Sequence, residues 1–315
     1  MNTYSYEVII IGSGATGGVA AKTFAEAGIN VLIVEAGPSI SALKAYGSEP
    51  GNSISRVKGI ISGEHRIQCQ HPGYWKNNPL LYSNEKDNPY ETTNNNPFIW
   101  TQGRQVGGRS LTWGGITLRL SDSEFKASDK DNYGESWPIS YNDLSSHYSA
   151  LERDLKVHGN KDNLEQLPDG EYKEPFPFTQ AEEIFKTIIS KNLNYPVINS
   201  RGFGPFRPKH ENDWSPSSSL GSSLKKALET GNVKILSNHI AERIIPNIQK
   251  SLAEGLIVID TRDGSRKKLL SKLVVVCAST IQTNRLLLNS EENSSEKGFI
   301  EPSGTLGKYL MDHIS

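Results

Sequence analysis

The stretch that decides the fold runs from Glu7 to Gly17 and reads EVIIIGSGATG. A short β-branched apolar run that ends in glycine is typical of a strand buried on both faces of a parallel sheet. Residues 15–27 are rich in alanine, carry apolar residues at helical spacing and are followed by Gly28, which predicts a helix that ends there. Residues 30–35 (NVLIVE) form a second apolar run, so a β-helix-β unit is complete by residue 35.

The turn between the first strand and the helix fits the motif G-x-G-x-x-G, with glycines at positions 12, 14 and 17. Gly12 permits a tight turn, Gly14 lets a pyrophosphate approach the backbone, and Gly17 lets helix and strand pack closely. The N-terminus of the helix offers free N–H groups and the positive end of its dipole to phosphate. The motif therefore predicts a dinucleotide site.

An acidic residue completes this site. Glu35 follows Gly12 by 23 positions, close to the spacing of about 20 seen in dinucleotide-binding units. Its carboxylate is expected to accept hydrogen bonds from the ribose hydroxyls, and its charge argues against a 2′-phosphate and hence against NADP. The expected cofactor-binding residues of this unit are Gly12, Ser13, Gly14, Ala15, Thr16, Gly17, Glu35 and Ala36. The unit alone does not distinguish FAD from NAD.

A second glycine cluster spans residues 103–119 and reads GRQVGGRSLTWGGITLR, with five glycines. One interpretation is a cluster of turns or a β-bulge. The other is a second place where backbone comes close to a flat ligand, since glycine permits such an approach.

This cluster resembles a stretch of the glucose–methanol–choline (GMC) oxidoreductase family, G-R-x-x-G-G-S-[ST]-x-x-N-G-G, which covers the pyrophosphate and reaches the flavin. The matching residues are Gly103, Arg104, Gly107, Gly108, Ser110, Gly114 and Gly115. Arg109 and Trp113 depart from the pattern, where the family often has Ser and Asn. Thr112 stands where related pyranose oxidases carry a histidine bonded to the flavin, so the resemblance implies non-covalent FAD.

Further segments resemble the same family. Residues 232–245 are similar to the strand pair that holds adenine through backbone near Ala241, and residues 274–288 are similar to a stretch that places Ala278 at the cofactor. Residues 304–313 match a family segment that ends in Asp312 and His313 and supports the flavin region.

The resemblance implies an α/β fold with a Rossmann-like FAD-binding domain, of the GMC and glutathione-reductase type, and a partial, inserted substrate domain. Residues 1–37, 100–125 and 220–315 would form the discontinuous FAD-binding domain. Residues 38–99 would form an excursion or lid without periodicity that packs over the cofactor domain, and residues 126–219 a partial substrate or cap region.

Local patterns predict the remaining elements. Helices are expected to start at Ser140, at Thr179 and at Ser215, the last continuing through leucines at positions 220, 224 and 228. Strands are expected over 233–236, 255–261 and 273–278, and a closing helix over 281–288. Arg266, Lys267 and Lys268 follow an Asp-Gly turn signal and are expected to form a solvated hairpin arm.

The composition of the chain argues against several classes of function. The formal net charge of -1 across 315 residues provides no field for nucleic acid or an anionic membrane. Two cysteines are too few for a disulfide framework or a cysteine zinc site, and we expect no metal. No apolar run approaches a membrane span, and no basic leader precedes the first strand, so a cytoplasmic location is expected.

The resemblance implies an FAD-dependent oxidoreductase that acts on the CH–OH group of a small-molecule alcohol or sugar by hydride transfer to flavin N5. In that family the catalytic histidine lies near the C-terminus, beyond the point that corresponds to Ser315, so we assign no catalytic residue. The remaining histidines, His65 among them, have the sequence context of surface or capping residues. We therefore expect an N-terminal fragment that is inactive alone and whose partner is the missing C-terminal half.

Two alternatives stay open at the level of sequence. One is a non-catalytic remnant that still binds FAD. The other is an NAD-dependent dehydrogenase with an ordinary Rossmann domain, against which the cluster at 103–119 argues, since such an enzyme has no use for it.

Overall fold

A computed structural model describes residues 6–93, 95, 98–247, 252–292 and 303–310. The chain divides into two compact units. Unit 1 consists of Met1–Trp113 and Arg207–Ser315, and unit 2 of Gly114–Phe206. The assignment of unit 1 to cofactor binding and of unit 2 to a cap region stays a prediction.

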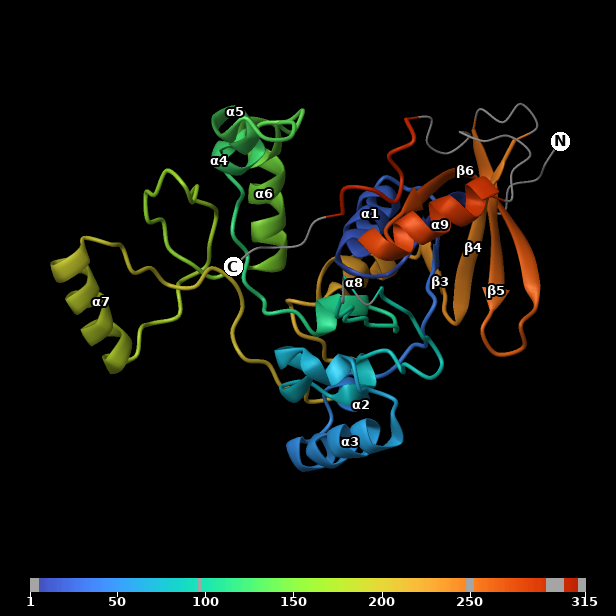
Figure 1. Cartoon of the computed structure of the whole chain (residues 1–315), viewed down its shortest axis with the longest axis horizontal. Coiled ribbons are helices and arrows are strands. Elements are labelled where there is room, and N and C mark those ends of the chain that lie inside the picture. The colour runs from blue at the N-terminus through green and yellow to red at the C-terminus, as the bar shows by residue number, and fades with distance from the viewer. Residues whose placement is uncertain (1–5, 94, 96–97, 248–251, 293–302, 311–315) are drawn as a thin grey trace. The chain divides into compact units, whose positions relative to one another are not determined.

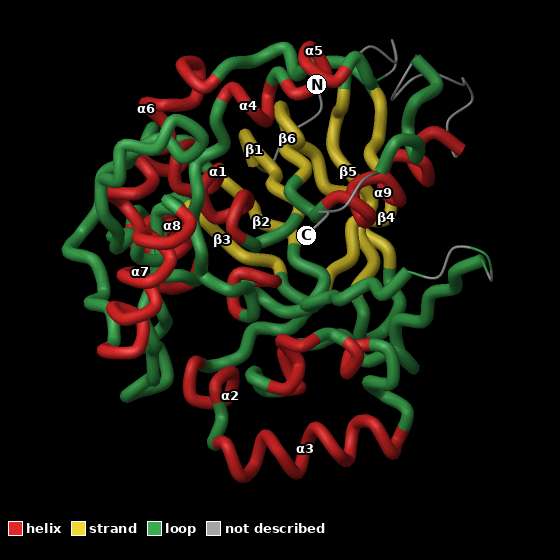
Figure 2. Tube along the Cα trace, turned by 60° about the vertical axis from the view of Figure 1, so that its left-hand side comes forward, coloured by secondary structure: helices red, strands yellow, loops and turns green. Residues whose placement is uncertain are grey.

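Unit 1 is built on a six-stranded sheet with the order β3-β2-β1-β6-β5-β4 (Figures 1 and 2). The strands are β1 (Tyr6–Ile11), β2 (Val31–Val34), β3 (Val233–Leu236), β4 (His239–Pro246), β5 (Ala253–Asp260) and β6 (Arg266–Val276). Strands β3, β2, β1 and the second half of β6 are parallel, with Ile10 beside Ile33 of β2 and Val275 of β6. The first half of β6 pairs antiparallel with β5, and β5 with β4.

The two faces of β1 explain why its sequence is apolar without alternation. Val8 and Ile10 pack on one face with residues of α1 (Ala15–Glu26) and α8 (Ser223–Glu229). Ile9 and Ile11 pack on the other face with strands β4 and β5 and with Leu286 of α9 (Thr280–Glu292). Each of these four side chains is at most 5% exposed. A central parallel strand covered on both faces needs such a continuous apolar run.

Residues 38–100 of unit 1 contain more regular structure than their composition indicates. They form α2 (Ala42–Tyr46), α3 (Glu49–Ser62) and three 3-10 turns, around a small core that includes Tyr74, Leu81 and Tyr82. The expectation of a segment without periodicity is wrong for α3. Ser48 caps this helix, and Gly63 ends it in a left-handed conformation.

The remaining expected elements are present, but several bounds differ: β5 and β6 begin at Ala253 and Arg266 rather than at residues 255 and 273, and one helix starts later than expected. Helices α6 (Tyr141–Leu155) and α7 (Gln180–Leu193) begin with capping boxes at Ser140 and Thr179. The helix expected from Ser215 is wrong in its start, because a 3-10 turn over Ser219–Gly221 comes first and the backbone of Ser222 breaks the path before α8.

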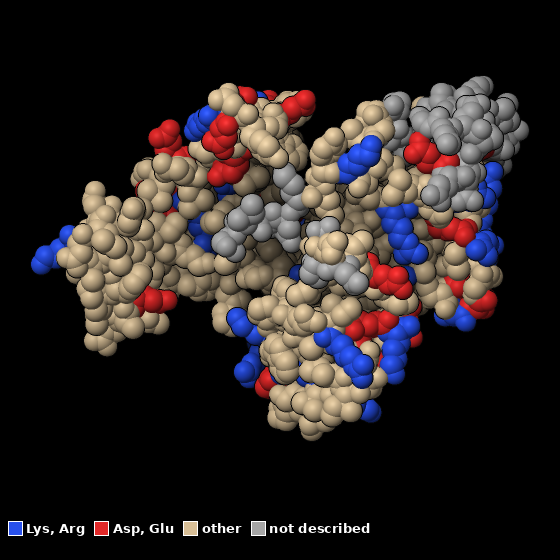
Figure 3. Space-filling view, in the orientation of Figure 1, with Lys and Arg blue, Asp and Glu red and all other residues tan. Residues whose placement is uncertain are grey.

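The hairpin between β5 and β6 confirms the expected solvated arm. Arg266 pairs with Glu242 at 2.8 Å, and Lys268 lies 3.9 Å from Glu254. Figure 3 shows basic and acidic side chains interspersed over these strands, as expected for a surface without one dominant sign.

Unit 2 consists of helices and loops joined by isolated bridges. Its helices are α4 (Asp122–Phe125), α5 (Ala127–Asp131), α6 and α7. Arg201 is fully buried and bonds Asp162 and Asp169, each at 2.9 Å. Helix α7 contains no buried residue, although its sequence is amphipathic.

Candidate cofactor site

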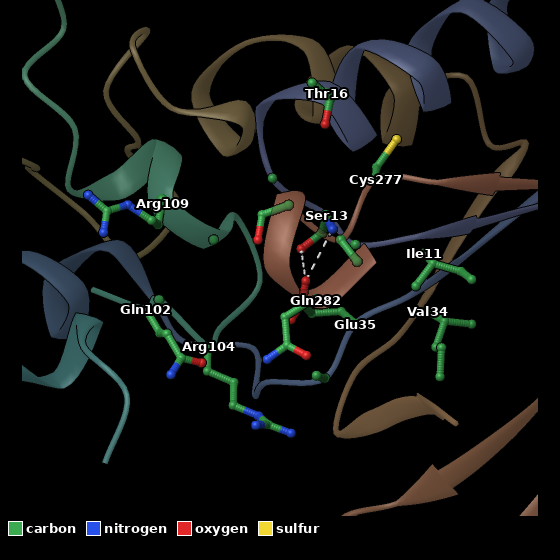
Figure 4. A pocket seen from close by; sticks show the side chains of 18 of the residues that line it. Ile11, Ser13, Thr16, Val34, Glu35, Gln102, Arg104, Arg109, Cys277 and Gln282 are labelled. Atoms are coloured by element: carbon green, nitrogen blue, oxygen red, sulfur yellow. Dashed lines mark hydrogen bonds between the residues drawn. The ribbon is translucent and has the colours of Figure 1, made fainter. Parts of the chain in front are cut away.

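A cavity of about 490 Å³ opens at the carboxyl ends of the parallel strands in unit 1 (Figure 4). Strands β1, β2 and β6 each contribute the residues that follow their last apolar position: Gly12, Glu35 and Cys277. The strands that follow β1 in the sequence, β2 and β3, lie on one side of it in the sheet. The last strand, β6, lies on its other side, so the strand order reverses between β1 and β6. In open α/β sheets, ligands bind at this reversal of strand order.

The first glycine loop is closed tightly against its neighbours. A Cβ on Gly17 would lie 2.0 Å from the carbonyl oxygen of Gly12, and one on Gly12 would lie 2.4 Å from the carbonyl oxygen of Cys277. Among the described residues, by contrast, no atom lies within 4 Å of a Cβ built on Gly14. Gly12 and Gly17 are therefore required by the fold, and Gly14 borders open space in the cavity.

Glu35 is held by three donors from the protein. Its Oε2 accepts from Ser13 Oγ at 2.6 Å and from Ser13 N at 3.1 Å, and its Oε1 accepts from Gly37 N at 2.9 Å (Figure 4). Burial raises the pKa of the Glu35 carboxyl, while these hydrogen bonds and the nearby Arg104 guanidinium act in the opposite direction. The carboxylate is thus fixed in orientation, and Oε1 keeps a further lone pair for a ligand.

The second glycine cluster lies directly over the first. Gly107 N donates to Ser13 Oγ at 3.0 Å, and a Cβ on Gly108 would lie 3.5 Å from Gly14 Cα. Both glycines have positive φ, 94° and 50°, a region that favours glycine. The segment is a cluster of turns around a 3-10 turn over Gly108–Leu111, and it also brings its backbone close to the first loop, so a contact with a flat ligand stays a prediction.

A cationic side chain enters the same cavity. Arg104 bonds the side chain of Asn88, and its pKa is lowered first by burial and then by the charge of Arg285. Both arginines line the cavity, and Figure 4 shows Arg104 extending along it past Glu35. A cavity with two arginines favours an anionic ligand.

The cavity brings together most of the residues expected from the sequence. Those that line it are Gly12, Ser13, Gly14, Ala15, Thr16, Glu35, Ala36, Arg104, Gly108, Ser110, Trp113, Ala241 and Ala278. Gly17 and Gly107 do not line the cavity, but Gly17 packs against Gly12 and Gly107 N donates to Ser13 Oγ. Thr112 is buried, and its hydroxyl donates to Arg109 O at 3.4 Å. Gly114 and Gly115 belong to unit 2.

Several lining residues were not expected from the sequence. They are Ile11, Val34, Trp100, Thr101, Gln102, Arg109, His239, Ile240, Cys277, Gln282, Arg285 and Leu286. Gln282 and Arg285 lie one turn apart on α9, and helical spacing after the last parallel strand, β6, could have indicated them. His239 could not be found in this way, because the pairing of β4 with β5 brings it to Asp260, 3.6 Å away and distant in the sequence.

The histidines expected on surfaces or caps divide into two kinds. His71 caps a turn by accepting from Gly73 N at 3.0 Å, as expected. His65 departs from that expectation, because it is buried and its Nδ1 lies 3.3 Å from the hydroxyl of Tyr74. Asp312 and His313 lie outside the described residues.

Two kinds of feature are absent from the part of the chain that the structure describes. No helix there has the length and apolar character needed to cross a bilayer. No group of three or more His, Cys, Asp or Glu side chains there is arranged to hold a metal ion.

Solved structures share the fold of this chain at low sequence identity. Pyridoxine 4-oxidase from Mesorbium loti matches 91% of this chain and 52% of its own, with a TM-score of 0.55 and 18% identity. An FAD-dependent oxidoreductase from Chaetomium thermophilum matches 91% of this chain and 48% of its own, with a TM-score of 0.57 and 17% identity. The expected α/β, Rossmann-like fold class is confirmed.

Curated relatives match the chain over nearly its whole length. The fructose dehydrogenase large subunit of Gluconobacter japonicus is 24% identical over 334 residues, which cover 99% of this chain and 59% of that protein. The 2-methyl-1,2-propanediol dehydrogenase of Mycolicibacterium austroafricanum is 24% identical over 331 residues, 98% of this chain and 55% of that protein. The chain thus spans between half and two thirds of the length of these relatives.

The family comparison covers the sheet, the cavity and unit 2 together. The family model described as GMC oxidoreductase matches residues 6–315. The chain therefore belongs to the GMC oxidoreductase family.

Proposed function

We propose that this chain is the FAD-binding part of an oxidoreductase that acts on the CH–OH group of an alcohol or a sugar. The observation that carries the proposal is the juxtaposition of two glycine loops, with Gly108 directly over Gly14, beside the buried acceptor Glu35. An NAD-dependent dehydrogenase needs only the first loop and its acid. The names of the relatives, a fructose and a propanediol dehydrogenase among them, support the substrate class.

The residues present fit a dinucleotide. The open space beside Gly14 would receive the pyrophosphate, at the N-terminus of the 12-residue helix α1. Glu35 would accept from the ribose hydroxyls through Oε1. The backbone near Ala241, at the first residues of β4, would lie along the adenine.

The charge of the cavity agrees with this placement. Arg104 and Arg285 would offset the two negative charges of the pyrophosphate, and the first-turn N–H groups of α1 would bond its oxygens. When bound, FAD supplies the N5 atom that takes a hydride from the substrate carbon. This chain's own contribution is to bind and orient the cofactor, and we assign no catalytic base to it.

We further propose that the FAD is held without a covalent bond. Thr112 occupies the position of the covalent histidine in related enzymes, and its hydroxyl is directed to backbone rather than into the cavity. Acid precipitation of the reconstituted protein is expected to release all flavin into the supernatant. Flavin that stays with the pellet would contradict this part of the proposal.

The chain covers 59% and 55% of the lengths of two relatives. We propose that the parts of these relatives that this chain does not match act together with it to oxidise the substrate. The test is to reconstitute residues 1–315 with FAD and to assay fructose and short diols with an artificial electron acceptor. FAD binding without turnover is expected. Robust turnover by a monomer would refute the proposed division of labour.

A further inference from the structure

A run of serines in unit 1 has a role that its local sequence does not show. Residues 215–223 read SPSSSLGSS and contain six serines. Ser219 is 3% exposed and bonds two segments that are distant in the sequence. Its Oγ donates to the carbonyl oxygen of Ser13 at 2.9 Å, and its backbone N donates to Ser110 Oγ at 3.0 Å.

These bonds close a ring. Ser110 Oγ donates in turn to the carbonyl oxygen of Gly107 at 2.6 Å, and Gly107 N donates to Ser13 Oγ at 3.0 Å. The serine ring thus consists of Ser13, Gly107, Ser110 and Ser219. It joins the first glycine loop, the second glycine loop and the serine run, and its three serines are each at most 8% exposed.

Gly18 of α1 has no side chain, and this leaves room for the serine run to pack against the helix. A Cβ on Gly18 would lie 2.7 Å from Ser223 Oγ and 3.0 Å from Ser219 Cβ. A side chain at position 18 would therefore clash with the serine run and keep Ser219 from contacting the first glycine loop. This second glycine of the pair Gly17-Gly18 serves contact with the serine run, whereas Gly17 serves contact with Gly12.

We propose that Ser219 is a positioning residue for the cofactor, which holds the two glycine loops closed on the pyrophosphate of one dinucleotide. Ser219 does not itself line the cavity, so it acts through Ser13 and Ser110, which do. A separate bond, which does not involve Ser219, orients the hydroxyl of Ser13: Gly107 N donates to Ser13 Oγ, so the hydroxyl hydrogen is left for Glu35. This inference rests on the proposed function, since it requires a dinucleotide in the cavity.

A positioning role and a plain packing role make different predictions for a series of ligands. AMP reaches the adenosine end of the site, at Glu35, but has no pyrophosphate. FAD spans both loops. Loss of the ring should therefore weaken FAD and leave AMP nearly unchanged, whereas general loosening of the fold should weaken both ligands alike.

The experiment compares Ser219→Ala with Ser83→Ala in the purified chain by titration with FAD and with AMP. Ser83 is the matched control, because it is 3% exposed and its Oγ has no hydrogen-bond partner among the described residues. We expect FAD to bind about 5- to 20-fold more weakly to Ser219→Ala, as for the loss of one or two buried hydrogen bonds, with AMP affinity unchanged. Ser83→Ala should bind both ligands like the unmodified chain.

A second variant keeps the inference testable if Ser219→Ala folds poorly. Ser110→Ala removes the acceptor of Ser219 N without changing the serine run, and the same ligand pattern is expected. The two substitutions should be less than additive, since they break one ring. Equal weakening of AMP and FAD, or unchanged FAD affinity in both variants, would overturn the inference while leaving FAD binding by the unmodified chain intact. Failure of the unmodified chain to bind FAD would instead overturn the proposed function.

Discussion

The central sheet of unit 1 and helix α7 of unit 2 place their apolar residues in opposite surroundings. On β1, Val8 to Ile11 are at most 5% exposed. On α7, Ile184, Phe185 and Ile188 are each at least 50% exposed. The strand is covered from both faces within its own unit, and the helix is left without cover by the residues that the structure describes. The difference shows that elements of unit 1 bury the apolar run of β1, whereas the apolar side chains of α7 stay exposed among the described residues.

The largest loss of stability is expected when the buried arginine of unit 2, Arg201, loses its charge. Arg201→Met would leave Asp162 and Asp169 without their buried partner, and removal of one member of a buried ion pair costs about 3–5 kcal/mol. We expect amide hydrogen exchange to accelerate across residues 114–206 while FAD affinity stays within about twofold, because the cavity is lined by unit 1. Loss of FAD binding in this variant would show that the site depends on unit 2.

A second prediction concerns the framework of the first glycine loop. Gly17→Ala introduces a Cβ only 2.0 Å from the carbonyl oxygen of Gly12, so backbone must move, and we expect the free energy of unfolding to fall by about 2–4 kcal/mol. The matched control is Gly14→Ala, whose Cβ meets no described atom within 4 Å. Equal urea midpoints for the two variants would contradict the assigned roles of these glycines.

A third prediction separates binding from folding. Gly14→Val places a branched side chain where the pyrophosphate would lie, and the backbone there, with φ -66°, accommodates valine. We expect FAD affinity to fall by at least about 100-fold, roughly 2.7 kcal/mol, with little change in melting temperature. Unchanged affinity, measured by equilibrium titration, would mean that phosphate does not bind at this loop.

Part of the fold and of the candidate site could be predicted from the sequence. Strand β1, the loop and Glu35 were predicted because adjacent residues decide them: an apolar run, then glycines, then an acid at fixed spacing. The serine ring was not, because the bond from Ser219 to Ser13 joins residues 206 positions apart. Helix α3 was missed although Ser48 and Gly63 mark its ends, since internal glycines weaken its apolar periodicity.

A fourth prediction uses the ionisation of Glu35. Burial raises its pKa, so this carboxyl takes up a proton at a higher pH than the 4.5 of an ordinary glutamate. Ribose binding requires the ionised carboxylate, so FAD affinity should weaken as the pH falls to the raised pKa of Glu35 and should recover above that pKa. Glu35→Gln should bind FAD about tenfold more weakly near neutral pH and lose this pH dependence. An identical pH profile in the variant would assign the dependence to another group.

The smallest effect on stability is expected on α7. Ile188→Lys replaces a side chain that is 50% exposed, so the free energy of unfolding of this chain should change by less than about 0.5 kcal/mol. The variant should also remain soluble at higher concentration, because an exposed apolar stripe promotes association. A clear drop in the urea midpoint would show that α7 is already covered in solution.

The most direct test of FAD binding is a competition between FAD and NAD for the purified chain. Each dinucleotide is titrated alone, and FAD is then displaced by excess NAD, with flavin absorbance and fluorescence as readouts. Because two glycine loops, and not one, border the cavity, the account predicts that FAD binds tightly and that NAD neither binds comparably nor displaces it. Tighter binding of NAD, or no change in the flavin spectrum on mixing, would contradict it.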